Sequence, residues 1–200
     1  MSKAWPVNDI DPEAPVIQNA RRVLAVRIAE FYSFEPVVRH PELSEALHDL
    51  RISAKRLRYT LELFRPQLGK AGERQIERVK AIQEVLGRLH DHDVRIDIIG
   101  HELSDLMLEQ SRQTRSAIAD ASPEELAAIA AAVLRPPPDD PRRGLIALLA
   151  REHAARRTAY ARFRELWDAC GDDGMRRDLV ELSITPVPEG RGDARTAAAS

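Results

Sequence analysis

Apolar residues recur every three or four positions between residues 44 and 65, and this spacing constrains the fold more than any other feature of the chain. The repeating set is Leu47, Leu50, Ala54, Leu57, Leu61 and Phe64. Such spacing places the side chains along one side of an α-helix, whereas a half-buried strand would alternate. We therefore predict a helix that starts near Pro41 or Ser44, ends near residue 64 or 65, before Pro66, and buries its apolar side against other helices.

The remaining predicted elements are also helices. Asp11-Pro12-Glu13 is a helix start signal, and that helix is expected to run to about Phe34. The other expected helices cover residues 73 to about 119, 123 to about 134, 143 to 167 and 175 to 182. Alanine, leucine, arginine and glutamate dominate the composition, which favours helix over sheet.

These patterns predict an all-α fold, an antiparallel four-helix bundle with additional short helices. We expect the bundle to span residues 12–168 and a short helical extension to span 169–184. Residues 185–200 lack core-forming side chains and are expected to be disordered.

Composition limits the class of function. The formal net charge is −2, so an anion site must be a local concentration of basic residues, and a nucleic-acid-binding protein is disfavoured. The single cysteine, Cys170, fits a reducing cytoplasm. The N-terminus lacks the apolar core of a secretion signal, and no run of about eighteen apolar residues suggests a membrane span. We expect a cytoplasmic protein with no membrane partner.

Basic side chains form a stripe beside the apolar side of the predicted helix 44–65. His48, Arg51, Lys55 and Arg58 follow one another at intervals of three, four and three residues, so they share one edge of that helix. Glu62 is the only acid close to the stripe. Cations at the edge of a core repel one another unless an anion or acidic partners compensate them. The stripe is therefore either a solvated face or one wall of an anion-binding groove.

Two further arginines fall on apolar faces of other predicted helices. Arg27 lies among the apolar residues of the first helix, and Arg156 lies among those of the last long helix. A buried arginine needs a partner because it does not lose its proton. Either Arg156 pairs with Glu152 and Arg27 with an acid on a neighbouring helix, or both arginines converge with the basic stripe on one groove.

A second cluster of polar residues, His90, Asp91, His92 and Asp93, is followed by Asp97 and His101. Asp93, Asp97 and His101 share a helical face and could hold a metal. A structural or hydrogen-bonding role and a part in the basic groove are the other two readings. No phosphate-binding glycine loop, nucleophile elbow or zinc-ligand pair occurs in the chain, so we expect a protein that is not an enzyme and needs no metal or other cofactor.

Two segments resemble the CHAD family, the conserved histidine α-helical domain: HDLRISAKRLRYTLELF from His48 and KAIQEVLGRLHDHDV from Lys80. The resemblance extends more loosely over about residues 12 to 168. It implies a helical bundle that binds inorganic polyphosphate through basic side chains and that associates with polyphosphate granules in bacteria and archaea. The binding residues that it implies are His48, Arg51, Lys55, Arg56, Arg58 and Lys80, joined by Arg22, Arg27, Arg156 and Arg157.

The chain departs from the family in one respect. Many members contain two related helical halves that face each other across a basic cavity, whereas this chain carries the signature once. A single half leaves the groove open, so either the site is smaller or a homodimer rebuilds the cavity. Two alternative functions stay open: a metal-dependent phosphohydrolase using His90, Asp93, Asp97 and His101, and a helical scaffold in which the arginines pair within the chain.

Overall fold

The computed structural model describes residues 3–135 and 138–184, and every regular element within these residues is a helix. The elements are α1 (Val16–Tyr32), the 3-10 helix η1 (Glu35–Arg39), α2 (Ser44–Leu63), α3 (Arg65–Ala119), α4 (Pro123–Leu134), α5 (Pro141–Asp172) and α6 (Met175–Ile184). The all-α prediction is confirmed. The predicted disordered tail, residues 185–200, lies outside the described residues.

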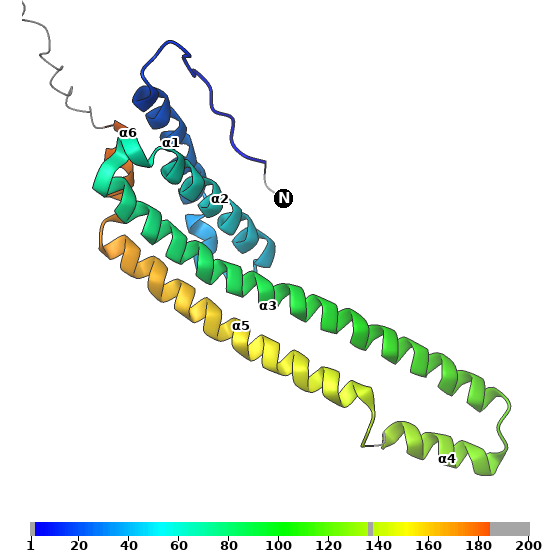
Figure 1. The fold of residues 1–200 in the computed structure, drawn as a ribbon. Coiled ribbons are helices and arrows are strands. Elements are labelled where there is room, and N and C mark those ends of the chain that lie inside the picture. The colour runs from blue at the N-terminus through cyan, green and yellow to red at the C-terminus, as the bar shows by residue number, and fades with distance from the viewer. Residues whose placement is uncertain (1–2, 136–137, 185–200) are drawn as a thin grey trace, which may run out of the picture.

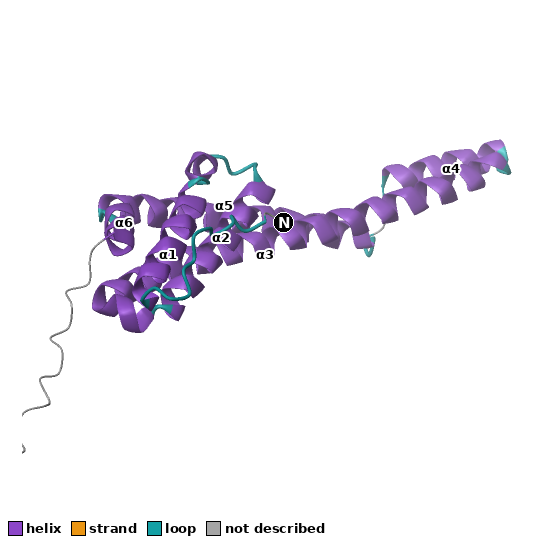
Figure 2. Cartoon of the chain, turned by 90° about the horizontal axis from the view of Figure 1, so that it is seen from above, coloured by secondary structure: helices purple, strands orange, loops and turns teal. Residues whose placement is uncertain are grey.

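The helices form a body at one end of the molecule and an arm at the other (Figure 1). In the body, α1, α2 and α6 lie against one end of the long antiparallel pair α3 and α5. Beyond the body, α3 and α5 continue as an arm, and α4 folds back along the tip of α3, as the view from above in Figure 2 also shows. An antiparallel four-helix bundle is not confirmed, because α1 and α2, of 17 and 20 residues, accompany only part of the 55-residue α3.

The hydrophobic core lies in the body. The side chains that α1, α2 and α3 bury there include Leu24, Phe31, Leu50, Leu57, Leu61, Ile76, Ile82 and Leu86, all at most 1% exposed. Phe163 of α5 and Met175 and Leu179 of α6 belong to the same core, so α6 is packed into the body. At about 25 cal/mol per Å² of apolar surface, burial of this kind supplies most of the stabilisation of a helical protein.

Two predicted helix starts are displaced. The first helix begins at Val16 instead of near Asp11, because Pro15 occupies the N-cap position and disfavours a helical Ala14 before it. Asp11 instead closes a turn, where its carboxylate accepts from the backbone N–H of Glu13 at 3.0 Å. The third helix begins at Arg65 instead of near Glu73.

Gly69 is the one non-helical residue within α3, with φ of 57° and ψ of −153°. This conformation is accessible to glycine and strained for other residues, so Gly69 supplies the bend through which the chain leaves α2 and enters the long part of α3. Within the described residues, no helix is long and apolar enough to span a membrane.

Candidate functional site

The basic residues of α2 divide between two sides of the helix. Arg56 points toward α1, where its Nη1 lies 2.6 Å from the Glu30 carboxylate. Arg51 and Arg58 lie about 140–160° away around the helix, on the side that packs against α3. The structure therefore does not gather the predicted binding residues into one group.

On the α1 side, the Glu30 carboxylate is 1% exposed and lies between two arginines. Arg27 Nη1 donates to it at 2.6 Å, as does Arg56 Nη1. Arg27 also donates to the backbone carbonyl of Trp5 at 3.1 Å, which ties the N-terminal segment to α1. The expectation that Arg27 pairs with an acid on a neighbouring helix is wrong, because its partner Glu30 lies on its own helix. The place of Arg27 in a binding groove stays a prediction.

On the α3 side, two contacts fix the register between the helices. The ring centroids of His48 and His90 lie 4.3 Å apart, and Arg51 Nε lies beside Gly87. Because the helices are antiparallel, each step forward on α2 corresponds to a step back on α3 (Figure 1). The same register sets Lys55 across from Gln83 and Arg58 across from Lys80. We call these eight residues, His48, Arg51, Lys55 and Arg58 with Lys80, Gln83, Gly87 and His90, the α2–α3 seam.

Buried polar atoms without a hydrogen-bond partner concentrate along the α2–α3 seam. His48 Nδ1, Arg51 Nε, Arg58 Nε and Gln83 Oε1 are four of the six such side-chain atoms among the described residues. A buried polar atom left unpaired costs about 1–3 kcal/mol. Hydrogen-bond partners for these three nitrogens and one oxygen would have to come from water or from a bound molecule.

The cations of the α2–α3 seam are only loosely neutralised. Arg58 Nε lies 3.6 Å from the Glu62 carboxylate, beyond a well-formed charged hydrogen bond, and Lys80 Nζ lies 3.9 Å from Glu77. The Tyr59 ring lies under both Arg58, at 4.7 Å, and Lys55, at 5.7 Å. An aromatic face favours a cation without cancelling its charge, so these side chains keep their capacity to bind an anion.

The other predicted binding residues lie elsewhere. Arg22 donates to the backbone carbonyl of Asp9 at 2.6 Å, and Arg157 is exposed on α5. Arg156 pairs with Asp93 of α3 and donates to the carbonyl of Pro41 at 2.8 Å. The expected pairing of Arg156 with Glu152 is therefore wrong.

Glu152 instead joins α5 to another part of α3. Its carboxylate, 9% exposed, lies 2.7 Å from His92 Nδ1 and 3.5 Å from Arg95 Nη1. The hydrogen bond from His92 lowers the pKa of Glu152. His92 and Asp93 thus link α3 to α5 through Glu152 and Arg156. This is the structural role considered for the cluster from His90 to Asp93.

An acidic pocket closes one end of the α2–α3 seam. It has a volume of about 330 Å³ and is lined by Ser44, Glu45, His48, Asp49, His90, Asp93, Val94 and Asp97. Four carboxylates at this end would repel a polyanion, so an anion bound along the seam would extend from His48 toward Arg58 and Lys80.

The residues considered as alternative metal ligands do not form a metal site. Asp93 is engaged by Arg156, and His101 Nδ1 bonds the backbone carbonyl of Asp97 on its own helix at 2.7 Å. In the part of the chain that the structure describes, no group of three histidine, cysteine or carboxylate side chains is arranged to hold a metal ion.

His48 should make the protein less stable in acid. Burial lowers its pKa below the usual 6.5, and the nearby His90 and Arg51 lower it further, against the opposing effect of Asp49. The unfolded chain therefore binds this proton more readily, so stability is full above pH ~6.5 and is lost as pH falls through the lowered pKa. Urea unfolding at pH 7.5 and 5.5 should show a larger loss for the parent than for His48→Gln, and an equal loss in both would contradict this assignment.

Sequence reasoning identified the α2 side of the seam but missed most of the α3 side. Only Lys80 was assigned there, although Lys80, Gln83, Gly87 and His90 repeat the same three, four, three spacing as His48, Arg51, Lys55 and Arg58. The spacing is present in the sequence, but glycine and glutamine carry no charge, so charge patterning does not single them out. Glu30, which neutralises two arginines, was also missed, although it lies one turn after Arg27.

Comparison with known proteins gives one family match. The family model of the CHAD domain matches residues 4–100, which hold the N-terminal segment, α1, η1, α2 and the part of α3 that lies in the body. No curated protein and no solved structure matches the chain. Both sides of the α2–α3 seam lie within the matched residues, and the arm beyond residue 100 lies outside them.

Proposed function

Because residues 4–100 belong to the CHAD domain family, we propose that this chain binds inorganic polyphosphate along the α2–α3 seam and does not turn it over. The observation that carries the proposal is the row of buried, unpaired side-chain nitrogens of His48, Arg51 and Arg58. In the cytoplasm, such a module would bring the chain to polyphosphate granules.

The chemistry of the α2–α3 seam suits a linear phosphate polymer. Arg51 and Arg58 are seven residues apart on α2, a separation of about 10 Å along the helix, with Lys55 between them. Arginine offers forked N–H donors to phosphate oxygens, and lysine adds a compact point charge. Cations repeated along one direction match an anion whose charges repeat along its chain.

Binding of a phosphate chain would also reduce the electrostatic repulsion among the cations of the α2–α3 seam. The guanidinium groups of Arg51 and Arg58 and the ammonium groups of Lys55 and Lys80 share one seam, and their nearest carboxylates lie at 3.6 Å or more. A phosphate chain would supply acceptors for the accessible N–H groups at the ends of these side chains and compensate the mutual repulsion of the cations. These residues need no change of protonation and no metal to hold phosphate, which favours binding without turnover.

The set of binding residues that we propose is smaller than the one predicted from the sequence. Arg27, Arg56 and Arg156 are held by Glu30 and Asp93, so their charges are largely compensated within the protein. We therefore assign direct contact with polyphosphate to His48, Arg51, Lys55, Arg58 and Lys80. Arg27, Arg56 and Arg156 would instead position the helices that form the seam.

A thermal-shift titration with polyphosphates of graded length, at two salt concentrations, tests the proposal. A ligand that binds only the folded state raises Tm, and a polyanion displaces counterions, so the shift should grow with chain length and shrink steeply at high salt. Orthophosphate at the same total phosphate concentration is the control and should raise Tm far less. Equal shifts for orthophosphate and long chains would contradict the proposal.

The phosphohydrolase alternative has one supporting feature, since His90, Asp93 and Asp97 line the same acidic pocket. Purified protein incubated with polyphosphate and divalent metal ions distinguishes the two functions. Release of orthophosphate that stops on addition of a chelator would replace the binding proposal with the enzymatic one.

A further inference from the structure

Helix α4, at the tip of the arm, presents an apolar surface that no other part of the chain within residues 3–135 and 138–184 covers. Leu126 and Val133 are 40% and 46% exposed, although both are large apolar residues, and Ala127, Ala130 and Ala131 between them are exposed as well. The inner side of α4 rests on the end of α3, where Ala128 and Ile129 line a shallow pocket with Ala117 and Ala121. The outer side thus forms an uncharged face along most of the helix.

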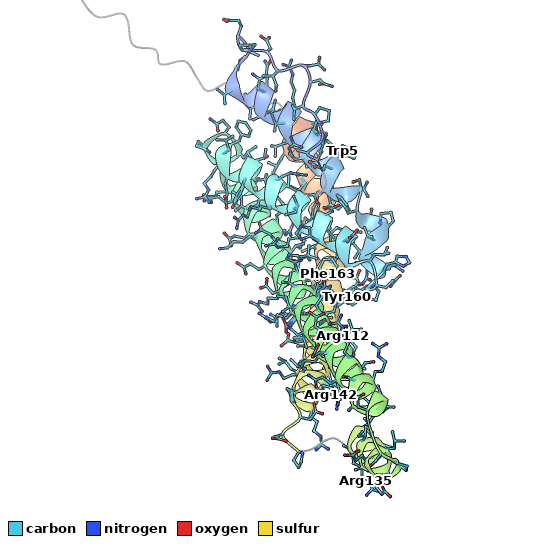
Figure 3. The ribbon with its side chains drawn as sticks, turned by 90° about the vertical axis from the view of Figure 1, so that its right-hand side faces the viewer. Trp5, Arg112, Arg135, Arg142, Tyr160 and Phe163 are labelled. Atoms are coloured by element: carbon cyan, nitrogen blue, oxygen red, sulfur yellow. The ribbon has the colours of Figure 1, made fainter. Side chains whose placement is uncertain are left out.

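Two opposite charges stand at the ends of this face. Glu124 lies in the first turn of α4, near the tip of the arm, and Arg135, labelled in Figure 3, follows the last residue of α4 at its other end. Glu124, Ala127, Ala131 and Arg135 follow one another at intervals of three, four and four, so they lie along one stripe of the exposed side. Neither Glu124 nor Arg135 has an ion-pair partner among the residues that the structure describes, and about 16 Å of helix separates them.

From this arrangement we propose that α4 is the interface through which two copies of the chain associate as an antiparallel dimer. When two such helices lie side by side in opposite directions with Ala127 and Ala130 at the centre of the contact, Glu124 of each copy meets Arg135 of the other along one edge. Along the opposite edge, Leu126 of each copy meets Val133 of the other. A parallel arrangement would set Glu124 against Glu124 and Arg135 against Arg135. The charges therefore select one isologous pairing with a two-fold axis near the middle of α4.

Antiparallel pairing of the α4 helices also determines the shape of the dimer. Since α4 lies along the arm, antiparallel α4 helices direct the two arms in opposite directions and place the two bodies at opposite ends (Figure 1). Each α2–α3 seam would stay open at its own end. A single 12-residue helix buries less than a standard interface of about 800 Å² per partner, so the dimer should be reversible and depend on concentration.

Sedimentation velocity of the full chain, over an about 100-fold range of concentration and without polyanion, tests this inference. We expect an elongated species that shifts from monomer to dimer as concentration rises. Replacing Leu126 and Val133 together with glutamate should leave only monomer. A chain that sediments as a monomer throughout, or a dimer that survives the double replacement, would overturn the proposal.

Exchanging the charges of Glu124 and Arg135 tests whether the molecule that covers the exposed face of α4 is a second copy of the chain. Glu124→Arg and Arg135→Glu alone should each weaken dimerisation by about tenfold or more, because each sets like charges against each other. The double variant carrying both changes should regain dimerisation close to that of the parent. Arg112→Glu, the same change on an exposed arginine of α3, is the control and should have no effect. If the double variant stays as weak as the single ones, the antiparallel pairing is wrong. Circular dichroism of each variant shows whether α4 is still folded.

Discussion

Replacing Arg51 and Arg58 together with alanine is expected to weaken the binding of long-chain polyphosphate by about 3–6 kcal/mol, which is a hundredfold or more. The reason is that each side chain has charged N–H donors that the protein uses poorly: Arg51 Nε has no hydrogen-bond partner among the described residues, and Arg58 Nε has only the Glu62 carboxylate at 3.6 Å. Hydrogen bonds from a charged donor to an anion contribute about 1.5–3 kcal/mol each. Isothermal titration calorimetry at a fixed, low salt concentration measures the change.

The matched control for this variant is Arg112→Ala with Arg115→Ala. Both arginines are exposed on the arm, and the pair removes the same total charge from the same chain. Nonspecific attraction to a polyanion would weaken equally in both double variants, whereas a defined site weakens only in the first. Full-strength binding by the Arg51 and Arg58 variant would exclude the α2–α3 seam as the site.

The Tm of the same double variant, measured without polyphosphate, tests whether Arg51 and Arg58 stabilise the fold. Arg51 and Arg58 carry unpaired buried atoms and lie near other cations, so their removal should not lower the Tm of the free protein. A large loss of Tm would mean that these side chains have an essential packing role, as the long arginine stem can.

Replacing Glu30 with alanine is expected to destabilise the fold by about 3–5 kcal/mol. Its carboxylate is 1% exposed and holds Arg27 and Arg56, each at 2.6 Å. Removing it leaves two guanidinium groups, 14% and 23% exposed, without their anion and close to each other. Urea unfolding followed by circular dichroism at neutral pH measures the free energy.

A triple variant separates the loss of charge balance from the loss of packing. Changing Glu30 to leucine together with Arg27→Met and Arg56→Met removes all three charges and fills a similar volume. Replacing a whole buried ionic group in this way is often neutral or stabilising, so the triple variant should recover most of the stability lost in Glu30→Ala. If Glu30→Ala unfolds at the same urea concentration as the parent, Glu30 does not neutralise the two arginines.

Much of the secondary structure could be predicted because its causes are local. The apolar repeat from Leu47 to Phe64 predicted the end of α2 to within about two residues, and Ser44 was one of its two predicted starts. The start of α4 was predicted at residue 123, where the structure shows a capping box between Ser122 and Glu125. The errors came where two local signals competed. Pro12 and Pro15 both suit a helix start, and the later one begins α1.

The shape of the molecule was harder to predict. The pattern of α3 could be followed past Gly100, but nothing in it showed that α1 and α2 would stop covering α3 there. The exposed Met107 and Ile146 of the arm look like core residues in the sequence. Periodicity reports which side of a helix is apolar, and it does not report whether a partner helix is present to cover it.

By itself, the sequence determined that the chain is helical and that His48, Arg51, Lys55 and Arg58 share one edge of α2, because both follow from the 3.6-residue turn of the helix. Only the tertiary structure decided which arginines keep their charge available. Arg56 reaches Glu30 across to α1 and Arg156 reaches Asp93 on α3. In the α2–α3 seam, Arg51 Nε has no hydrogen-bond partner among the described residues, and Arg58 has only Glu62 of its own helix, at 3.6 Å. The physical reason is that an ion pair depends on the register between helices, which core packing sets and which no spacing within a single helix contains.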